Sequence, residues 1–125
     1  DVAIFEVNPP DNATMLPVSA IAPPVGAQVE CIGLGSPRAA LRPFLGTVQS
    51  FGPDTMTVDA HVTPGDSGGP IVFSGTVVGT ITGGQKTTHR VALPDGEIWP
   101  VYKPLVSSNA AAVASVCQSY RVPDT

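Results

Sequence analysis

The residues best suited to chemistry lie in one short run, residues 65–70, which reads GDSGGP. Glycine at positions 65 and 68 allows a tight loop in which the backbone N–H groups of Gly65 and Ser67 converge on one point. Two such donors can stabilise a developing oxyanion, with the Ser67 hydroxyl beside them. The run therefore predicts a serine nucleophile with its oxyanion site. A glycine-serine turn in an unrelated β protein is the alternative.

The same run resembles the nucleophile loop of trypsin-like serine proteases. The resemblance continues without a gap through residues 71–75 (IVFSG) and 78–84 (VGTITGG). In that family the pattern is a strand, a turn and a second strand that forms the substrate-binding edge. Residues 1–7 (DVAIFEV) resemble the family's strand that begins with the catalytic aspartate. The resemblance therefore implies that Asp1 is the orienting acid.

Three further segments resemble family elements in the correct order. Residues 30–35 (ECIGLG) resemble the strand that opens the family's second barrel, and residues 100–103 (PVYK) resemble the strand that closes its specificity pocket. Residues 107–120 resemble the terminal helix. The match begins at the aspartate strand, so the family segment that carries the catalytic histidine has no counterpart in this sequence.

The missing histidine matters for the function of Ser67, because a serine hydroxyl is a poor nucleophile until a base takes its proton. His61 lies six residues before Ser67, where the family has a residue at the base of its specificity pocket, and His89 falls in the loop after the substrate-binding strand. Neither matches the general base. We expect a serine endopeptidase whose histidine comes from an N-terminal segment or chain outside this sequence. The alternative is a catalytically inactive protease-like binding module or effector.

The resemblance also implies roles for the loop and the pocket. Gly65 and the Ser67 backbone form the oxyanion hole, and Asp66 turns inward to hold the loop, where a buried carboxylate needs a partner. In some members of the family, the freshly cleaved amino terminus is the partner of this carboxylate. Here the α-amino group is on Asp1, at the wrong place to reach Asp66, so another donor is expected. The implied substrate pocket comprises His61, Val62, Thr63, Thr82, Gly83, Gly84, Trp99 and Pro100.

The composition of that pocket gives limited information on the substrate. No acidic residue lies at its base, so a preference for Lys or Arg is not supported. His61 could hydrogen-bond a polar or acidic substrate side chain, although an ordinary strand histidine is the alternative. Pro100, where the family usually has a small residue, is expected to narrow the pocket.

Length and composition fit one small domain. A chain of 125 residues can bury one core but is short for the two barrels of a complete trypsin-like enzyme. Its net charge of −4 offers no basic patch for nucleic acid or anionic lipid, and no apolar run is long enough to span a membrane. The expected partner is a polypeptide substrate, with no cofactor and no metal. A glycosylation sequon at Asn12 favours a secreted or extracellular protein.

The predicted elements are mostly strands. Six short apolar runs separated by Gly, Pro or Asp turns suit an all-β, closed antiparallel barrel, and the resemblance implies a six-stranded Greek-key barrel like the family's second. Ser107, Ser108 or Asn109 can cap a C-terminal helix. The expected strands are 28–34, 44–51, 55–62, 70–73, 76–82 and 98–102, and the expected helix is 108–120. The expected domains are 1–7 (a strand of an absent first barrel), 8–26 (a Pro-rich linker), 27–106 (the C-terminal barrel) and 107–125 (the helix and tail).

The two cysteines, Cys31 and Cys117, admit one intramolecular pairing. In the family the cysteine on the strand that matches Cys31 pairs with one just after the nucleophile loop, but Phe73 stands at that position here. A strand-to-helix bridge and a pair of free thiols both remain open. A bridge would support an oxidising compartment.

Overall fold

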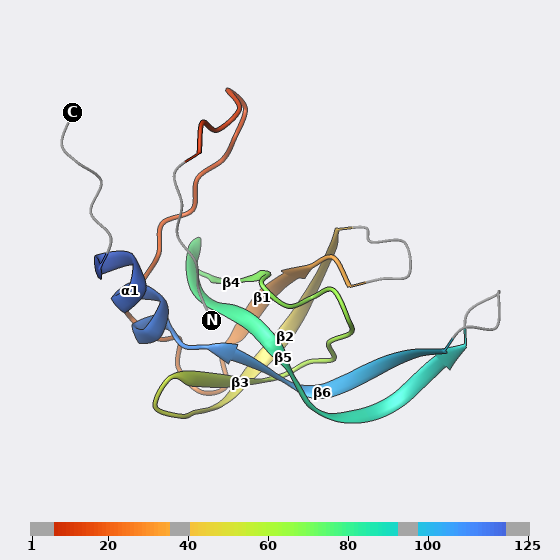
Figure 1. The fold of residues 1–125 in the computed structure, drawn as a ribbon. Helices are drawn as coiled ribbons and strands as arrows, with labels where there is room; N and C mark the ends of the chain where they lie inside the picture. The colour runs from red at the N-terminus through yellow and green to blue at the C-terminus, as the bar shows by residue number, and fades with distance from the viewer. Residues whose placement is uncertain (1–6, 36–40, 93–97, 120–125) are drawn as a thin grey trace, which may run out of the picture.

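The computed structural model describes residues 7–35, 41–92 and 98–119, with the side chains of 87–92 and 98 left aside. This part of the chain forms six β-strands followed by a helix (Figure 1). In chain order these are β1 (Gln28–Gly33), β2 (Arg42–Phe51), β3 (Thr55–Asp59), β4 (Pro70–Phe73), β5 (Thr76–Ala92), β6 (Ile98–Ser108) and α1 (Ala110–Ser119).

The strands close into a barrel in the order β1-β2-β3-β6-β5-β4, and each neighbouring pair is antiparallel. The barrel closes where β4 returns beside β1, with Cys31 opposite Ile71. The spatial order β4-β1-β2-β3 is that of a Greek key. The expected closed, six-stranded antiparallel barrel with a C-terminal helix is confirmed.

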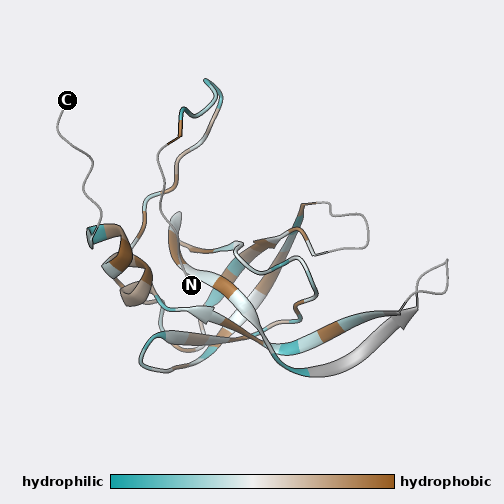
Figure 2. Cartoon of the chain, viewed as in Figure 1, coloured by the Kyte–Doolittle hydropathy of each residue, from teal (hydrophilic) through white to brown (hydrophobic). Residues whose placement is uncertain are grey.

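The core lies inside the barrel and follows from period-two alternation along the strands. In β1, Val29 and Cys31 are buried while Gln28 and Glu30 are exposed. In β3, Met56 and Val58 are buried in the same way. The strands in Figure 2 accordingly alternate between apolar and polar residues. Apolar side chains from all six strands form this core, because β2 adds Val48, β4 Ile71, β5 Val78 and Ile81, and β6 Leu105.

Strands β5 and β6 run well beyond the predicted 76–82 and 98–102, and they form a two-stranded ribbon that projects from the barrel (Figure 1). The predicted strand 76–82 ends just before Gly83 and Gly84, and glycine is depleted in strands. In the structure they pair with Val106 and Leu105 of β6, so cross-strand pairing overrides the local preference. His89 consequently lies in β5, opposite Val101, and not in a loop as expected.

The Pro-rich segment before the barrel contacts its surface from Pro17 onward. Val77 of β5 donates its backbone N–H to Pro17, 2.8 Å away, and Val18 forms a parallel bridge with Val77. Gly26 donates to the Val48 carbonyl at 2.8 Å, where the segment enters the barrel. Residues 1–6, including Asp1 and nearly all of the strand expected over 1–7, lie outside the described residues.

The helix α1 begins after Asn109, one of the three predicted capping residues. The Asn109 side-chain oxygen accepts the N–H of Ala112 at 2.8 Å, which satisfies an otherwise free donor of the first turn. Its amide nitrogen donates to the carbonyls of Gly52 and Pro53, so the same side chain ties the β2–β3 turn to the helix. No helix in the described ranges is long and apolar enough to cross a membrane.

We expect Asn109→Ala to lower the free energy of unfolding by about 1–2 kcal/mol, because the helix loses its cap and the turn loses two hydrogen bonds. Urea denaturation followed by circular dichroism measures this. Ser119→Ala is the control, since Ser119 is exposed at the other end of α1 and its hydroxyl bonds only the Val116 carbonyl. Equal stability of the two variants would contradict the capping role.

Candidate active site

The loop that carries Ser67 connects β3 to β4 and is held in shape by its own backbone. Gly65 and Gly68 have φ angles of 99° and 89°, in the left-handed region that glycine adopts without strain. Gly68 donates to the carbonyl of Ile81 at 2.7 Å, and Ile81 donates back to Gly69 at 2.9 Å. These two bonds fix the loop against β5 beside Ser67.

Asp66 turns into the protein and is 1% exposed. Its carboxylate accepts the backbone N–H of Gly35 at 2.9 Å and that of Thr63 at 3.0 Å, and it forms an ion pair with the guanidinium of Arg42. Arg42 also donates to the Gly35 carbonyl at 3.0 Å and lies over the Phe44 ring. The Asp66 carboxylate therefore holds the loop in place. Arg42 neutralises its charge and backbone N–H groups hydrogen-bond its oxygens, as the burial of a carboxylate requires.

Arg42 was absent from the predicted site residues, although an unidentified donor for Asp66 was expected. The signal available in the sequence was indirect: a buried carboxylate needs a cation, and Arg42 follows the ECIGLG segment at a short distance.

Two glycines in the ECIGLG segment leave room for the Asp66 side chain. A Cβ at Gly33 or Gly35 would collide with the Asp66 carboxylate, so both positions must be glycine for Asp66 to turn inward.

Two backbone donors flank the Ser67 hydroxyl without an acceptor. Among the described residues, nothing accepts the N–H of Gly65 or of Ser67, whereas those of Asp66, Gly68 and Gly69 are all bonded. The Ser67 Oγ itself donates to the Thr82 carbonyl at 3.1 Å. The loop thus combines an exposed hydroxyl with two unused N–H groups, the set that an oxyanion site needs.

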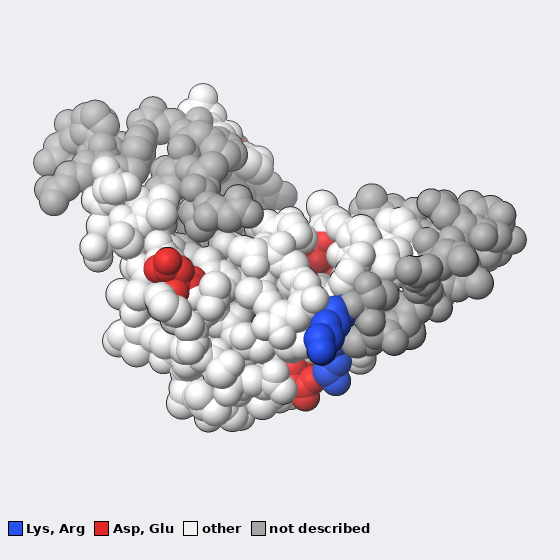
Figure 3. Space-filling view, turned by 60° about the horizontal axis from the view of Figure 1, so that its bottom comes forward, with Lys and Arg blue, Asp and Glu red and all other residues white. Residues whose placement is uncertain are grey.

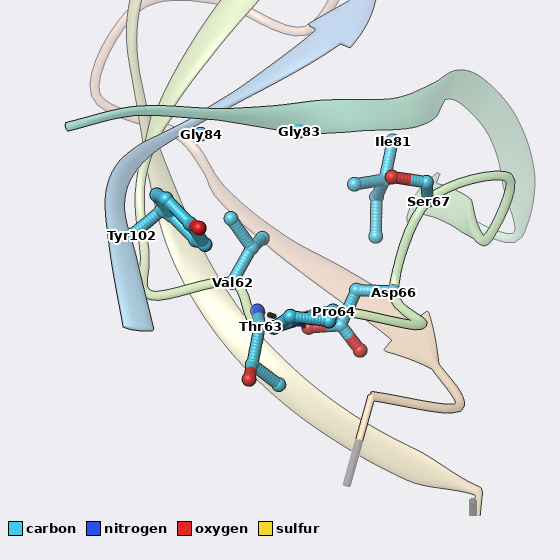
Figure 4. Close-up of a pocket in the computed structure, with 9 residues that line it drawn as sticks. All are labelled: Val62, Thr63, Pro64, Asp66, Ser67, Ile81, Gly83, Gly84 and Tyr102. Atoms are coloured by element: carbon cyan, nitrogen blue, oxygen red, sulfur yellow. Dashed lines mark hydrogen bonds between the residues drawn. The ribbon is translucent and has the colours of Figure 1, made fainter. Parts of the chain in front are cut away.

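A pocket of about 200 Å³ opens beside Ser67 (Figure 4). Gly83 and Gly84 of β5 form one wall, and Tyr102 of β6 closes one end, while Ser67 stands at the other. Its remaining lining is Val62, Thr63, Pro64, Asp66 and Ile81. Because the Asp66 carboxylate already pairs with Arg42, the pocket offers no free charge to a ligand among the described residues.

The predicted pocket residues divide into two groups. Thr63, Gly83 and Gly84 line the pocket together with Val62. Tyr102 also lines it; the resemblance placed it in the strand that closes the pocket, but it was not among the predicted pocket residues. Thr82 and Pro100 are not lining residues, but each is hydrogen-bonded to one. The Thr82 carbonyl accepts from the Ser67 hydroxyl, and the Pro100 carbonyl accepts from the Thr63 hydroxyl at 2.9 Å. His61, which is exposed, and Trp99, which is half-buried, are not among the lining residues.

A second hollow, of about 510 Å³, adjoins the same loop. It is lined by Ile32, Gly33, Leu34 and Leu41 together with the loop residues 65–70. Ser67 and Asp66 border both hollows, so the serine stands between a small pocket and a larger one with apolar walls.

The two cysteines are free thiols, so the Cys31–Cys117 bridge is not present in the structure. Cys31 is buried in the barrel core, whereas Cys117 is half-buried on α1, which packs outside the barrel against β5. Burial, reinforced by the negative charge of Asp66, raises the pKa of the Cys31 thiol to about 12.

No family model and no curated protein matches the chain. Within the described ranges, no group of three or more His, Cys, Asp or Glu side chains could hold a metal ion.

We expect Arg42→Met to lower the free energy of unfolding by about 2–4 kcal/mol, because it leaves the buried Asp66 carboxylate without its cation. Adding Asp66→Asn to this variant should restore part of the loss. Lys103→Met is the matched control, since the Lys103–Asp59 pair is 2.9 Å long but 40% and 45% exposed. The control should change stability by less than about 1 kcal/mol in the same urea denaturation. A loss at Arg42 no larger than this would contradict the lock.

We expect iodoacetamide at pH 8 to alkylate Cys117 in the folded protein and Cys31 only after unfolding, because the thiolate is the reactive form and its population at Cys31 is suppressed. Mass spectrometry of alkylated peptides measures this. Failure of both cysteines to react in the unfolded, unreduced protein would reveal a bridge instead.

Proposed function

We propose that this chain is the nucleophile-bearing part of a trypsin-like serine endopeptidase. The observation that carries the proposal is the Ser67 hydroxyl beside two acceptor-free backbone N–H groups, on a loop whose shape is imposed by the buried Asp66–Arg42 pair. Such rigidity supports catalysis, because oxyanion donors act only when they are held in place before the charge develops. The resemblance of the GDSGGP run to the family's nucleophile loop points the same way.

In the proposed reaction, the Ser67 Oγ attacks a peptide carbonyl and the oxyanion formed accepts hydrogen bonds from the N–H groups of Gly65 and Ser67. A base must take the hydroxyl proton and deliver it to the leaving amine. The resulting acyl-enzyme is then hydrolysed by water. The Thr82 carbonyl that accepts the hydrogen bond from the Ser67 hydroxyl is not basic enough to take its proton, so the proposal requires an imidazole from outside the chain, oriented by Asp1.

The pocket beside Ser67 suits an uncharged substrate side chain. Its volume of about 200 Å³ exceeds the ~150 Å³ in which an apolar cavity holds benzene, so a single medium-sized side chain fits. Val62, Ile81 and Tyr102 offer apolar contact, and the Thr63 hydroxyl is already engaged with Pro100. An ionised side chain would lose its hydration there without gaining a partner.

An inactive protease-like binding module is the second candidate, and the positions of the histidines favour it. His61 is exposed and does not line the pocket, and the hydroxyl of Ser67 is hydrogen-bonded to a backbone carbonyl. Without an added base, the site would bind an extended peptide but leave it intact. Covalent labelling of Ser67 separates the two candidates.

We expect a fluorophosphonate probe to label Ser67 slowly in the isolated chain. When the chain is coexpressed with the polypeptide that precedes Asp1 in its own gene, labelling should be at least ~10³-fold faster, because a missing triad member costs several orders of magnitude in rate. Labelling rates and tandem mass spectrometry identify the site. Ser67→Ala should abolish labelling, and Ser50→Ala, which removes an exposed serine of β2, should not.

Two results would contradict the proposal. Slow labelling with and without the upstream polypeptide would leave the binding module. Fast labelling of the isolated chain that disappears in His61→Ala, with the fold intact, would mean that the base lies within this sequence.

A further inference from the structure

The edge of β5 next to Ser67 is open. Strand β4 pairs with β5 only as far as Thr80, opposite Pro70, and the Ser67 loop then bonds to Ile81. From Thr82 to Lys86, β5 pairs with β6 on one side, and in the described part of the chain no strand pairs with the other. An extended peptide can add to such an edge through its main chain.

Two lysines stand at the far end of this edge. Lys86 of β5 lies directly opposite Lys103 of β6, so their side chains leave the same face of the ribbon with Cβ atoms about 5 Å apart. Lys103 pairs with Asp59 at 2.9 Å, whereas Lys86 is exposed and has no carboxylate within ion-pair distance in the described ranges. In Figure 3, the blue atoms of this face are gathered in one place, with red atoms next to them.

This arrangement costs folding free energy, because like charges directly opposite each other repel. The three charges also leave a local excess of one positive charge on a chain whose net charge is −4. A local arrangement that opposes stability is expected where the charges meet a ligand. A carboxylate suits this position, since it can bond the ammonium of Lys86 and shield it from Lys103.

The spacing along β5 fixes which residue of a peptide would carry that carboxylate. The Ser67 hydroxyl bonds the Thr82 carbonyl, so the peptide residue under attack lies beside Thr82. Lys86 is four residues further, about 13 Å along the strand. In an antiparallel peptide, the direction used by each neighbouring strand pair of this barrel, the residue opposite Lys86 is the fourth one N-terminal to the attacked residue.

We propose that Lys86, supported by Lys103, forms a subsite for a Glu or Asp side chain on the fourth residue N-terminal to the attacked residue. This inference rests on the proposed function for the position of the attacked residue. The subsite selects an acidic side chain at one end of the peptide, whereas the pocket beside Ser67 selects an uncharged side chain at the attacked residue. The favoured substrate is therefore an extended segment with an acidic residue at its N-terminal end and an uncharged residue at the cleavage position.

The test measures peptide binding to the full Ser67→Ala chain, so that no cleavage is needed. Three fluorescent peptides of about ten residues share a Leu at the attacked position and differ in one feature: Glu four residues before it, Gln at that place, or Glu four residues after it. Fluorescence anisotropy gives the three dissociation constants at low and at high salt.

We expect the first peptide to bind about threefold to fivefold more tightly than the other two, the range of an exposed ion pair, and the preference to vanish at high salt. Adding Lys86→Gln should remove the preference. Adding Gln85→Ala, which changes the neighbouring exposed residue of the same strand, should leave it unchanged. Lys103→Gln should weaken the preference only partly.

Equal binding of the first two peptides, a preference that survives Lys86→Gln, a preference for the C-terminal Glu, or no binding at about millimolar concentration would each overturn the subsite. Failure of the proposed function is read separately, from fluorophosphonate labelling of the wild-type chain coexpressed with the upstream polypeptide. A preference for the N-terminal Glu without fluorophosphonate labelling of Ser67 would mean that the subsite exists but belongs to a binding module and not to an enzyme. Labelling without a charge preference would leave an endopeptidase that lacks this subsite.

Discussion

The buried ion pair between Asp66 and Arg42 is the constraint on which the site depends. The carboxylate draws together β1, through the Gly35 N–H just after it, β2, through Arg42, and the segment after β3, through the Thr63 N–H. A single side chain thereby fixes the distance between three elements of the barrel. The left-handed glycines on either side of Asp66 and Ser67 let the chain turn back around this carboxylate without strain.

The predictable parts of the fold are those for which neighbouring residues in the sequence carry the signal. Alternating apolar residues and Gly or Pro turns indicate the strands, and Asn109 is a favoured capping residue at the start of a small-residue helix. The barrel closure was also expected from the number and spacing of the strands. The ribbon formed by β5 and β6 was not, because Gly83 and Gly84 are poor strand residues until β6 pairs with them.

The site was predictable to the extent that its chemistry lies within one continuous run. Gly65, Asp66 and Ser67 occupy adjacent positions, so their types alone suggest a loop, a buried acid and a hydroxyl. Arg42 and Tyr102 reach the site through the barrel's register, and no spacing along the chain encodes that register. The exposure of His61 likewise depends on where β3 ends, which the apolar run over 55–62 did not reveal.

The source of the cation that holds Asp66 has a consequence for control. In some members of the protease family that the Ser67 run resembles, a freshly cleaved amino terminus supplies the charge that holds this loop. Here the positive charge belongs to Arg42, an internal side chain that is present as soon as the barrel folds. The loop therefore needs no processing of the polypeptide to take its shape, and the domain can keep it while still fused within a longer precursor.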